Sequence, residues 1–145
     1  MTGIFGGIEA GGTKFVLAVG AEPNKIDARH EIPTRDPAGT MAEAAEWFES
    51  QGQLKALGIA TFGPAELNRQ SPKWGHILQT PKPGWSNCDI AGFFAKRFAV
   101  PIGFDTDVNG AALAEYSYRA NKQVSSLAYV TVGTGIGGGL LLERR

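Results

Sequence analysis

The sequence lacks three features that would each indicate a class of protein: cysteine pairs, runs of like charge and an unbroken apolar segment. Cys88 is the only cysteine, so it cannot form a disulfide within the chain or build a cysteine-based zinc site. Lys plus Arg and Asp plus Glu number 14 each, which gives a formal net charge of zero. That balance provides no general attraction to nucleic acid or to an anionic membrane.

The longest apolar stretch, residues 127–142, is interrupted by glycines and alternates like a strand, so it does not predict a membrane span. The first residues lack the basic and apolar segments of a signal peptide. We therefore expect a cytoplasmic protein that binds neither nucleic acid nor membranes. A chain of 145 residues with 43% hydrophobic residues can build one core of ordinary size.

Glycine is abundant, with 20 residues, and several of these glycines lie in or beside a Gly-Thr turn near the start of the chain. Residues 7–14 read Gly-Ile-Glu-Ala-Gly-Gly-Thr-Lys. Glycines let the backbone approach a phosphate closely, Thr13 can donate a hydrogen bond, and Lys14 can add positive charge. A plain hairpin turn explains the same residues, so this motif alone leaves both interpretations open.

A second Gly-Thr turn lies near the end of the chain, where residues 131–139 read Thr-Val-Gly-Thr-Gly-Ile-Gly-Gly-Gly. It is neither a Walker A loop nor a dinucleotide fingerprint, because no Gly-Lys-Ser/Thr follows and it leads into a strand. Close packing of a glycine-rich hairpin is the alternative to phosphate binding. Two copies of the same device in one chain favour phosphate binding and indicate two related domains.

The third motif, residues 105–115, begins Asp-Thr-Asp-Val-Asn-Gly and is expected to join a strand to a helix. Asp107 at this junction fits either a helix N-cap or a catalytic carboxylate. A carboxylate at the carboxyl end of a strand is also where α/β proteins place their chemistry. Asn109 can bind a polar ligand or satisfy local backbone, and Gly110 with its alanine neighbours lets the helix lie close to a sheet.

The pattern of apolar residues predicts a mixed α/β domain. Strands are expected at 4–8, 15–19 and 26–32 as an antiparallel meander, and further strands at 57–61, 101–105, 127–132 and 136–142. Thr40 and Glu43 match a capping box for a first helix. Helical spacing of Ile90, Phe94 and Phe98 predicts a second, and residues 107–118 a third. Residues 65–87 are irregular, and a loop of this length is often functional.

In this order and spacing, the three motifs resemble those of the ROK family of sugar kinases, and the similarity covers essentially the whole chain. The resemblance implies an actin-like, ribonuclease H-like sugar-kinase fold with a βββαβα core. It implies an N-terminal domain over residues 1–122, and the opening hairpin of a second, ATP-binding domain over 123–145. Family members are roughly twice this length, so we expect the N-terminal half of a kinase, with negligible activity as an isolated fragment.

The resemblance also assigns site residues. Asp107 corresponds to the catalytic base, and Glu9 stands where the family usually has an Asp that can approach Mg²⁺. The residues assigned to ATP phosphates are Gly11, Gly12, Thr13, Lys14, Gly133, Thr134, Gly135 and Gly137. Those placed beside the sugar are Gly63, Pro64, Thr106 and Asn109.

Glu9, Thr106 and the segment 80–85 resemble the fructokinase branch, so the expected reaction is transfer of the γ-phosphate of ATP to fructose, giving fructose 6-phosphate. MgATP is the expected cofactor, and a zinc site is expected only in the second half. Dimers are common in the family. The alternative is a sugar-sensing or sugar-binding domain of a ROK regulator, although such regulators carry a DNA-binding module before the first phosphate motif.

Overall fold

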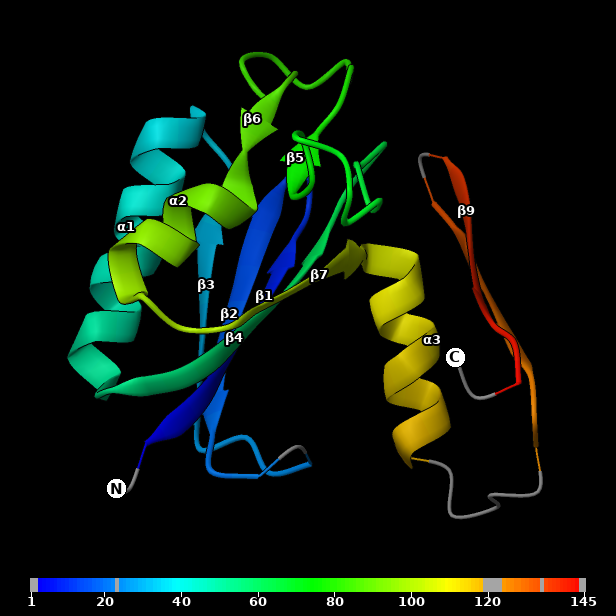
Figure 1. Ribbon diagram of the computed structural model, residues 1–145, viewed down its shortest axis with the longest axis horizontal. Helices are drawn as coiled ribbons and strands as arrows, with labels where there is room; N and C mark the ends of the chain where they lie inside the picture. Colours follow the sequence, from blue (N-terminus) through cyan, green and yellow to red (C-terminus); the bar gives the residue numbers. More distant parts are fainter. Residues whose placement is uncertain (1–2, 23, 119–123, 134, 144–145) are drawn as a thin grey trace.

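The computed structural model describes residues 3–22, 24–118, 124–133 and 135–143. Strands and helices alternate along these ranges in a mixed α/β order (Figure 1). In chain order the elements are β1 Ile4–Ala10, β2 Lys14–Gly20, β3 Ala28–Pro33, α1 Pro37–Gln51, β4 Leu54–Thr61, β5 His76–Ile77, β6 Cys88–Asp89, α2 Ile90–Phe98, β7 Ile102–Thr106, α3 Asp107–Tyr118, β8 Leu127–Val132 and β9 Ile136–Leu141.

The main sheet has five strands in the order β3-β2-β1-β4-β7. The first three form the expected antiparallel meander, while β4 pairs with β1 and β7 pairs with β4, both in parallel. The crossovers from β1 to β4 and from β4 to β7 carry helices, as parallel pairing requires. β5 lies within the long loop and pairs with β6, which follows the loop, and β8 pairs only with β9 in a separate two-stranded sheet.

Alternating side chains give the main sheet two different faces. Phe15, Leu17, Leu57 and Ile59 point to one face and are buried against α1 and α2. Each large apolar side chain buried in this way contributes roughly 1.5–3 kcal/mol. Trp85 of the long loop is also fully buried in this core. This loop residue therefore has a packing role, as large aromatic side chains commonly do.

The start of α1 differs from the predicted capping box. The helix begins at Pro37, and the carboxylate of Asp36 caps it by accepting a hydrogen bond from the Gly39 N–H at 2.8 Å. Proline is well suited to the first helical position because its missing N–H would have no partner there. Thr40 lies inside the helix instead, where its buried hydroxyl accepts from the Arg35 N–H at 2.9 Å.

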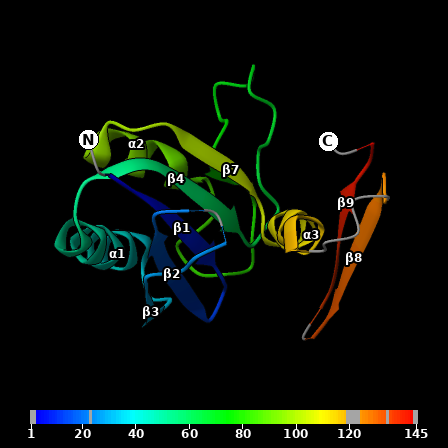
Figure 2. The same cartoon turned by 90° about the horizontal axis from the view of Figure 1, so that it is seen from below.

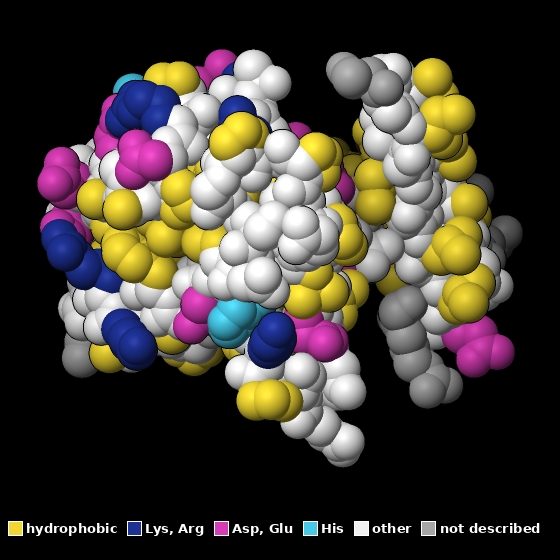
Figure 3. Space-filling model, turned by 90° about the horizontal axis from the view of Figure 1, so that it is seen from above, with side chains coloured by type: hydrophobic (Ala, Val, Ile, Leu, Met, Phe, Trp, Pro, Cys, Tyr) yellow, Lys and Arg dark blue, Asp and Glu magenta, His cyan; other side chains and the backbone are white. Residues whose placement is uncertain are grey.

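The helix α3 lies between the main sheet and the hairpin of β8 and β9 (Figures 1 and 2). It packs on the sheet face opposite α1 and α2, because an added Cβ on Gly110 would lie 2.8 Å from the Cβ of Ala60. The hairpin stands beside the rest of the molecule as a further layer (Figure 3). Its outward side chains include Val130, Val132 and Ile136, which are at least 64% exposed.

Candidate functional site

The carboxyl ends of β1, β4 and β7 lie side by side at one edge of the main sheet. Ala10 pairs with Thr61, and Thr61 pairs with Thr106, so the last residues of these three parallel strands form one row. The three segments that follow are the first Gly-Thr turn, the Gly63–Pro64 segment and the start of α3. The register therefore brings the predicted site residues of three separate motifs to one edge, where α/β proteins bind ligands.

The first Gly-Thr turn is tight and is held by hydrogen bonds to Thr34, which lies between β3 and α1. The Gly11 N–H donates to the Lys14 carbonyl at 2.9 Å, which closes the turn. Thr34 fixes it twice, by donating its hydroxyl to the Gly11 carbonyl at 2.7 Å and its N–H to the Thr13 carbonyl at 2.9 Å. At Gly12 an added Cβ would meet no atom within 4 Å, so this part of the turn is open to a ligand.

Lys14 is engaged in an ion pair on the exposed side of the sheet. Its ammonium group donates to the Glu31 carboxylate at 2.8 Å, and Arg29 binds the same carboxylate at 2.5 Å. These two hydrogen bonds, from Lys14 first and Arg29 second, lower the pKa of Glu31. A phosphate that recruits Lys14 has to compete with Glu31 for it.

The start of α3 concentrates polar groups around Asp107. Thr106 caps the helix, since its hydroxyl oxygen accepts the Asn109 N–H at 3.3 Å. The N-cap alternative for Asp107 is therefore taken by its neighbour. One oxygen of Asp107 accepts from the Val108 N–H at 2.9 Å, which orients the half-buried carboxylate. Its other oxygen has no hydrogen bond within the described part of the chain.

The glycines of the second hairpin pack directly on this helix start. An added Cβ on Gly139 would lie 2.1 Å from the Val108 carbonyl oxygen, and one on Gly137 would lie 2.9 Å from the Val108 side chain. Both glycines are thus required for close approach, as the packing interpretation of this motif predicted. At the turn, Gly133 donates to the Gly135 carbonyl at 2.9 Å, and both glycines are open to solvent. Thr134 lies outside the described residues.

The Gly63–Pro64 segment follows β4 and is joined by a cis peptide bond. The Phe62 N–H donates to the Ala10 carbonyl at 2.8 Å, which holds this segment beside the first turn. The Pro64 carbonyl accepts from the Leu78 N–H at 2.7 Å, which ties it to the long loop. Gly63 and Pro64 are both exposed, just beyond the carboxyl end of β4.

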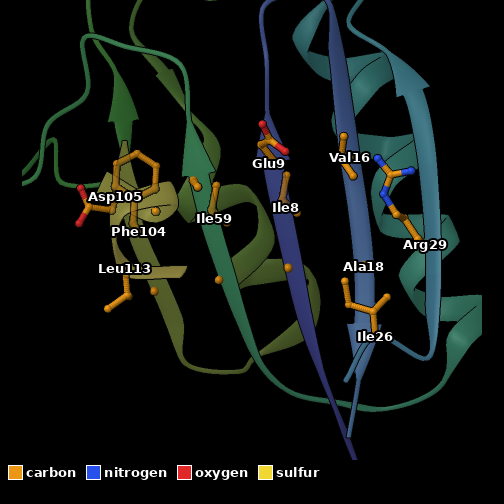
Figure 4. A pocket seen from close by; sticks show the side chains of 15 residues that line it. Ile8, Glu9, Val16, Ala18, Ile26, Arg29, Ile59, Phe104, Asp105 and Leu113 are labelled. Atoms are coloured by element: carbon orange, nitrogen blue, oxygen red, sulfur yellow. The ribbon is translucent and has the colours of Figure 1, made fainter. Parts of the chain in front are cut away.

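Two carboxylates, Glu9 and Asp105, flank Ala60 in one row across the sheet face that carries α3 (Figure 4). They line a cavity of about 610 Å³ whose wall also includes Arg29 and Leu113. Among the described residues no group of three or more His, Cys, Asp or Glu side chains could hold a metal ion. A metal at Glu9 would therefore depend on ligands from substrate and water, which is the usual way in which Mg²⁺ is bound with nucleotides.

The sequence profile of the ROK family matches residues 5–145 of the chain. The chain belongs to the ROK family. It is 46% identical to a fructokinase of Zymomonas mobilis and 43% identical to a fructokinase of Pediococcus pentosaceus. Each comparison covers 97% of the chain but 48% of the relative, so the chain spans about half the length of the curated relatives it matches.

The structure of a ROK hexokinase from Thermus thermophilus is similar to this chain, with a TM-score of 0.80 and 31% identity. The similarity covers 98% of the chain and 48% of that structure. This confirms the predicted actin-like, ribonuclease H-like fold and its mixed sheet. No helix among the described residues has the length and apolar character needed to cross a membrane.

Within this ROK site, sequence reasoning missed two contributors. Asp105 was seen only as part of a motif, yet it binds the Asn109 side chain directly. Gly139 was noted only as one glycine of a run, yet it makes the closest approach of the second hairpin to α3. The four-residue spacing of Asp105 and Asn109 was a usable signal, because the strand end and the first helical turn bring such residues together.

Proposed function

We propose that the protein containing this chain is an ATP-dependent hexose kinase that converts fructose to fructose 6-phosphate. The observation that carries the proposal is the row formed by the ends of β1, β4 and β7. It places an open glycine turn, the Gly63–Pro64 segment and the Asp107 carboxylate at one edge. The fructokinase relatives at 43% and 46% identity support the reaction and favour fructose over other hexoses.

Asp107 acts as the general base in this proposal. Its carboxylate accepts the proton of the attacking sugar hydroxyl while the hydroxyl oxygen bonds to the γ-phosphorus and ADP leaves. The hydrogen bond from Val108 fixes one carboxylate oxygen and leaves the other to face the substrate. The carboxylate stands at the first turn of a helix, where an anion is favoured by the helix dipole.

The phosphates of ATP are bound by the two Gly-Thr turns. Gly12 and Thr13 offer backbone N–H groups and a hydroxyl from one side, where Gly11 shapes the turn through its bond to Lys14. Gly133, Gly135 and Gly137 belong to the other side. Gly12, Gly133 and Gly135 have open space where a Cβ would stand, which fits close approach of a phosphate. Lys14 contributes charge when it exchanges Glu31 for phosphate, and Thr134 belongs to the same turn by sequence.

Glu9 fits a role as an oxygen donor near Mg²⁺. Its side chain is exposed near the carboxyl end of β1, and a nucleotide supplies the remaining ligands. When bound, Mg²⁺ would neutralise charge on the transferred phosphoryl group. The sugar lies beside Gly63, Pro64, Thr106 and Asn109. The Thr106 hydroxyl uses its oxygen to cap α3 and still has a proton to donate to a ligand.

Residues 123–145 open the second domain in this proposal, and residues 1–122 form the first. The separate hairpin sheet and its exposed Val132 and Ile136, at 77% and 80%, support a continuing domain that covers them. A zinc site in that domain, a dimer and a cytoplasmic location are predictions for the whole protein. The isolated segment is predicted to be inactive, because the adenine site is expected in the second domain.

The test is ADP release by the full-length protein with MgATP and a panel of hexoses. Fructose is expected to give the highest kcat/KM, and Asp107→Asn is expected to lower kcat by about 10²- to 10⁴-fold. Asp89→Asn is the matched control, because Asp89 also stands at a helix start, where it accepts the Gly92 N–H at 2.8 Å. If the wild type binds a sugar but does not release ADP, the kinase proposal fails and a sugar-sensing function takes its place.

A further inference from the structure

The side chain of Asn109 is held by a carboxylate that the proposed reaction does not use. Asp105, the next-to-last residue of β7, accepts a hydrogen bond from the Asn109 side-chain nitrogen at 2.7 Å. The same oxygen accepts the Thr106 N–H at 2.8 Å. Asp105 is therefore fixed by the backbone at the strand end and in turn fixes the amide in the first turn of α3.

This contact determines which end of the Asn109 amide remains for a ligand. An ionised carboxylate only accepts hydrogen bonds, so the group that faces it must be the amide NH₂. The Asn109 backbone is anchored as well, through its N–H to the Thr106 hydroxyl at 3.3 Å. With backbone and NH₂ both bound, the carbonyl oxygen is the part of the amide that is presented as an acceptor.

We propose that Asp105 is a positioning residue that orients Asn109 so that its carbonyl oxygen accepts a hydrogen bond from a sugar hydroxyl. This inference rests on the proposed function, in which Asn109 lies beside the sugar. Without Asp105 the amide can rotate about its last torsion and present the NH₂ group instead. Orientation by Asp105 thus selects a substrate that carries a hydrogen-bond donor, a hydroxyl, at this point.

A merely structural role for Asp105 makes a different prediction. In that role the Asp105 carboxylate holds the end of β7 by accepting the Thr106 N–H. Replacing Asp105 would then lower the stability of the fold by the same amount whether or not Asn109 is present. A positioning role acts only through the amide. The two are separated by asking whether the effect of Asp105 on sugar binding persists when Asn109 has no amide.

The experiment is a double-mutant cycle in the full-length protein, with KM for fructose, KM for ATP and the melting temperature measured for each variant. Asp105→Ala is expected to raise KM for fructose by up to about tenfold, the scale of one neutral hydrogen bond between Asn109 and the sugar, with KM for ATP unchanged within about twofold. In an Asn109→Ala background the same change is expected to alter KM for fructose by less than about twofold.

Two further variants keep the test independent of folding losses. Asp105→Asn retains an acceptor for the amide and is expected to restore most of the fructose affinity. Asp36→Ala removes another aspartate that accepts a backbone N–H, at 2.8 Å from Gly39, and is expected to change the melting temperature but not KM for fructose. An equal rise in KM from Asp105→Ala with and without Asn109, or an equal effect on both substrates, would overturn the proposal.

Deoxyfluoro sugars test the direction of the hydrogen bond, because fluorine cannot donate one. One monodeoxyfluoro fructose is expected to bind about tenfold more weakly than fructose to the wild type but not to Asn109→Ala. Tolerance of every such analogue by the wild type would overturn the acceptor role. If the wild type releases ADP with fructose and the cycle is additive, only this inference fails. If no hexose supports turnover, the proposed function fails and takes the inference with it.

Discussion

Gly139→Ala should slow catalysis in the full-length protein by separating the second hairpin from α3. The added Cβ would lie 2.1 Å from the Val108 carbonyl oxygen, and real Cβ contacts essentially never fall below 3.0 Å. Strand and helix must therefore move apart by roughly 1 Å, a displacement that can lower kcat about 10²-fold when it misplaces reacting groups. The crowding is also expected to cost about 1–3 kcal/mol of stability.

Gly138→Ala is the matched control for this change. Gly138 is the preceding residue on β9 but faces the other side, where an added Cβ would have its nearest neighbour, the Tyr129 carbonyl oxygen, at 4.0 Å. Its kcat is expected to stay within about twofold of wild type, since ordinary contact requires no movement. ADP release at saturating fructose and ATP measures both variants. Equal kcat for Gly139→Ala and Gly138→Ala would refute the idea that this contact sets the catalytic geometry.

Three further predictions concern Trp85, Cys88 and Glu31. Trp85→Phe removes an indole N–H that donates to the Arg35 carbonyl at 2.9 Å. Urea titration is expected to show a free energy of unfolding about 1–3 kcal/mol lower, and an unchanged value would contradict this role of the indole. Burial raises the pKa of Cys88 to about 11, so iodoacetamide at pH 8 should alkylate it on the order of 100-fold more slowly than an unperturbed cysteine, as followed by mass spectrometry. A hydrogen bond from Lys14 lowers the pKa of Glu31, so the pair stabilises the fold above the unfolded-state pKa and loses this effect as pH falls through the lower folded-state value. Glu31→Gln should flatten the melting-temperature profile below about pH 4.5, and an unchanged profile would disprove the pairing.

The parts of the fold that the sequence predicted correctly are those with strong local signals. The helical spacing of Ile90, Phe94 and Phe98 predicted the second helix, which runs over Ile90–Phe98 in the structure. The first Gly-Thr turn gave the hairpin of the meander, because the glycines and the flanking apolar alternation agree. The change from strand to helix at Asp107 was also predicted correctly, since Thr106 and Asp107 both favour a helix start.

The errors arose where two local signals competed or where contacts are distant in sequence. Both Asp36-Pro37 and Thr40 fit a helix start, and only tertiary packing shows that Thr40 is buried inside the helix. The approach of Gly139 to Val108 depends on how β9 lies against α3, which no local pattern contains. The phosphate and packing interpretations of the second glycine motif are compatible, because its turn is open while its strand is packed.

The proposed site is held together in two physically different ways. The ends of β1, β4 and β7 are fixed relative to one another by backbone hydrogen bonds of a continuous sheet, so their geometry tolerates many side-chain changes. The second Gly-Thr turn belongs to another sheet, and its hairpin is tied to the start of α3 by the packing of Gly137 and Gly139 on Val108. Any movement of the hairpin relative to the sheet must therefore carry α3 with it or open this contact. Single-atom additions on that glycine face should consequently affect phosphoryl transfer more strongly than larger changes on the outer face of the same strand.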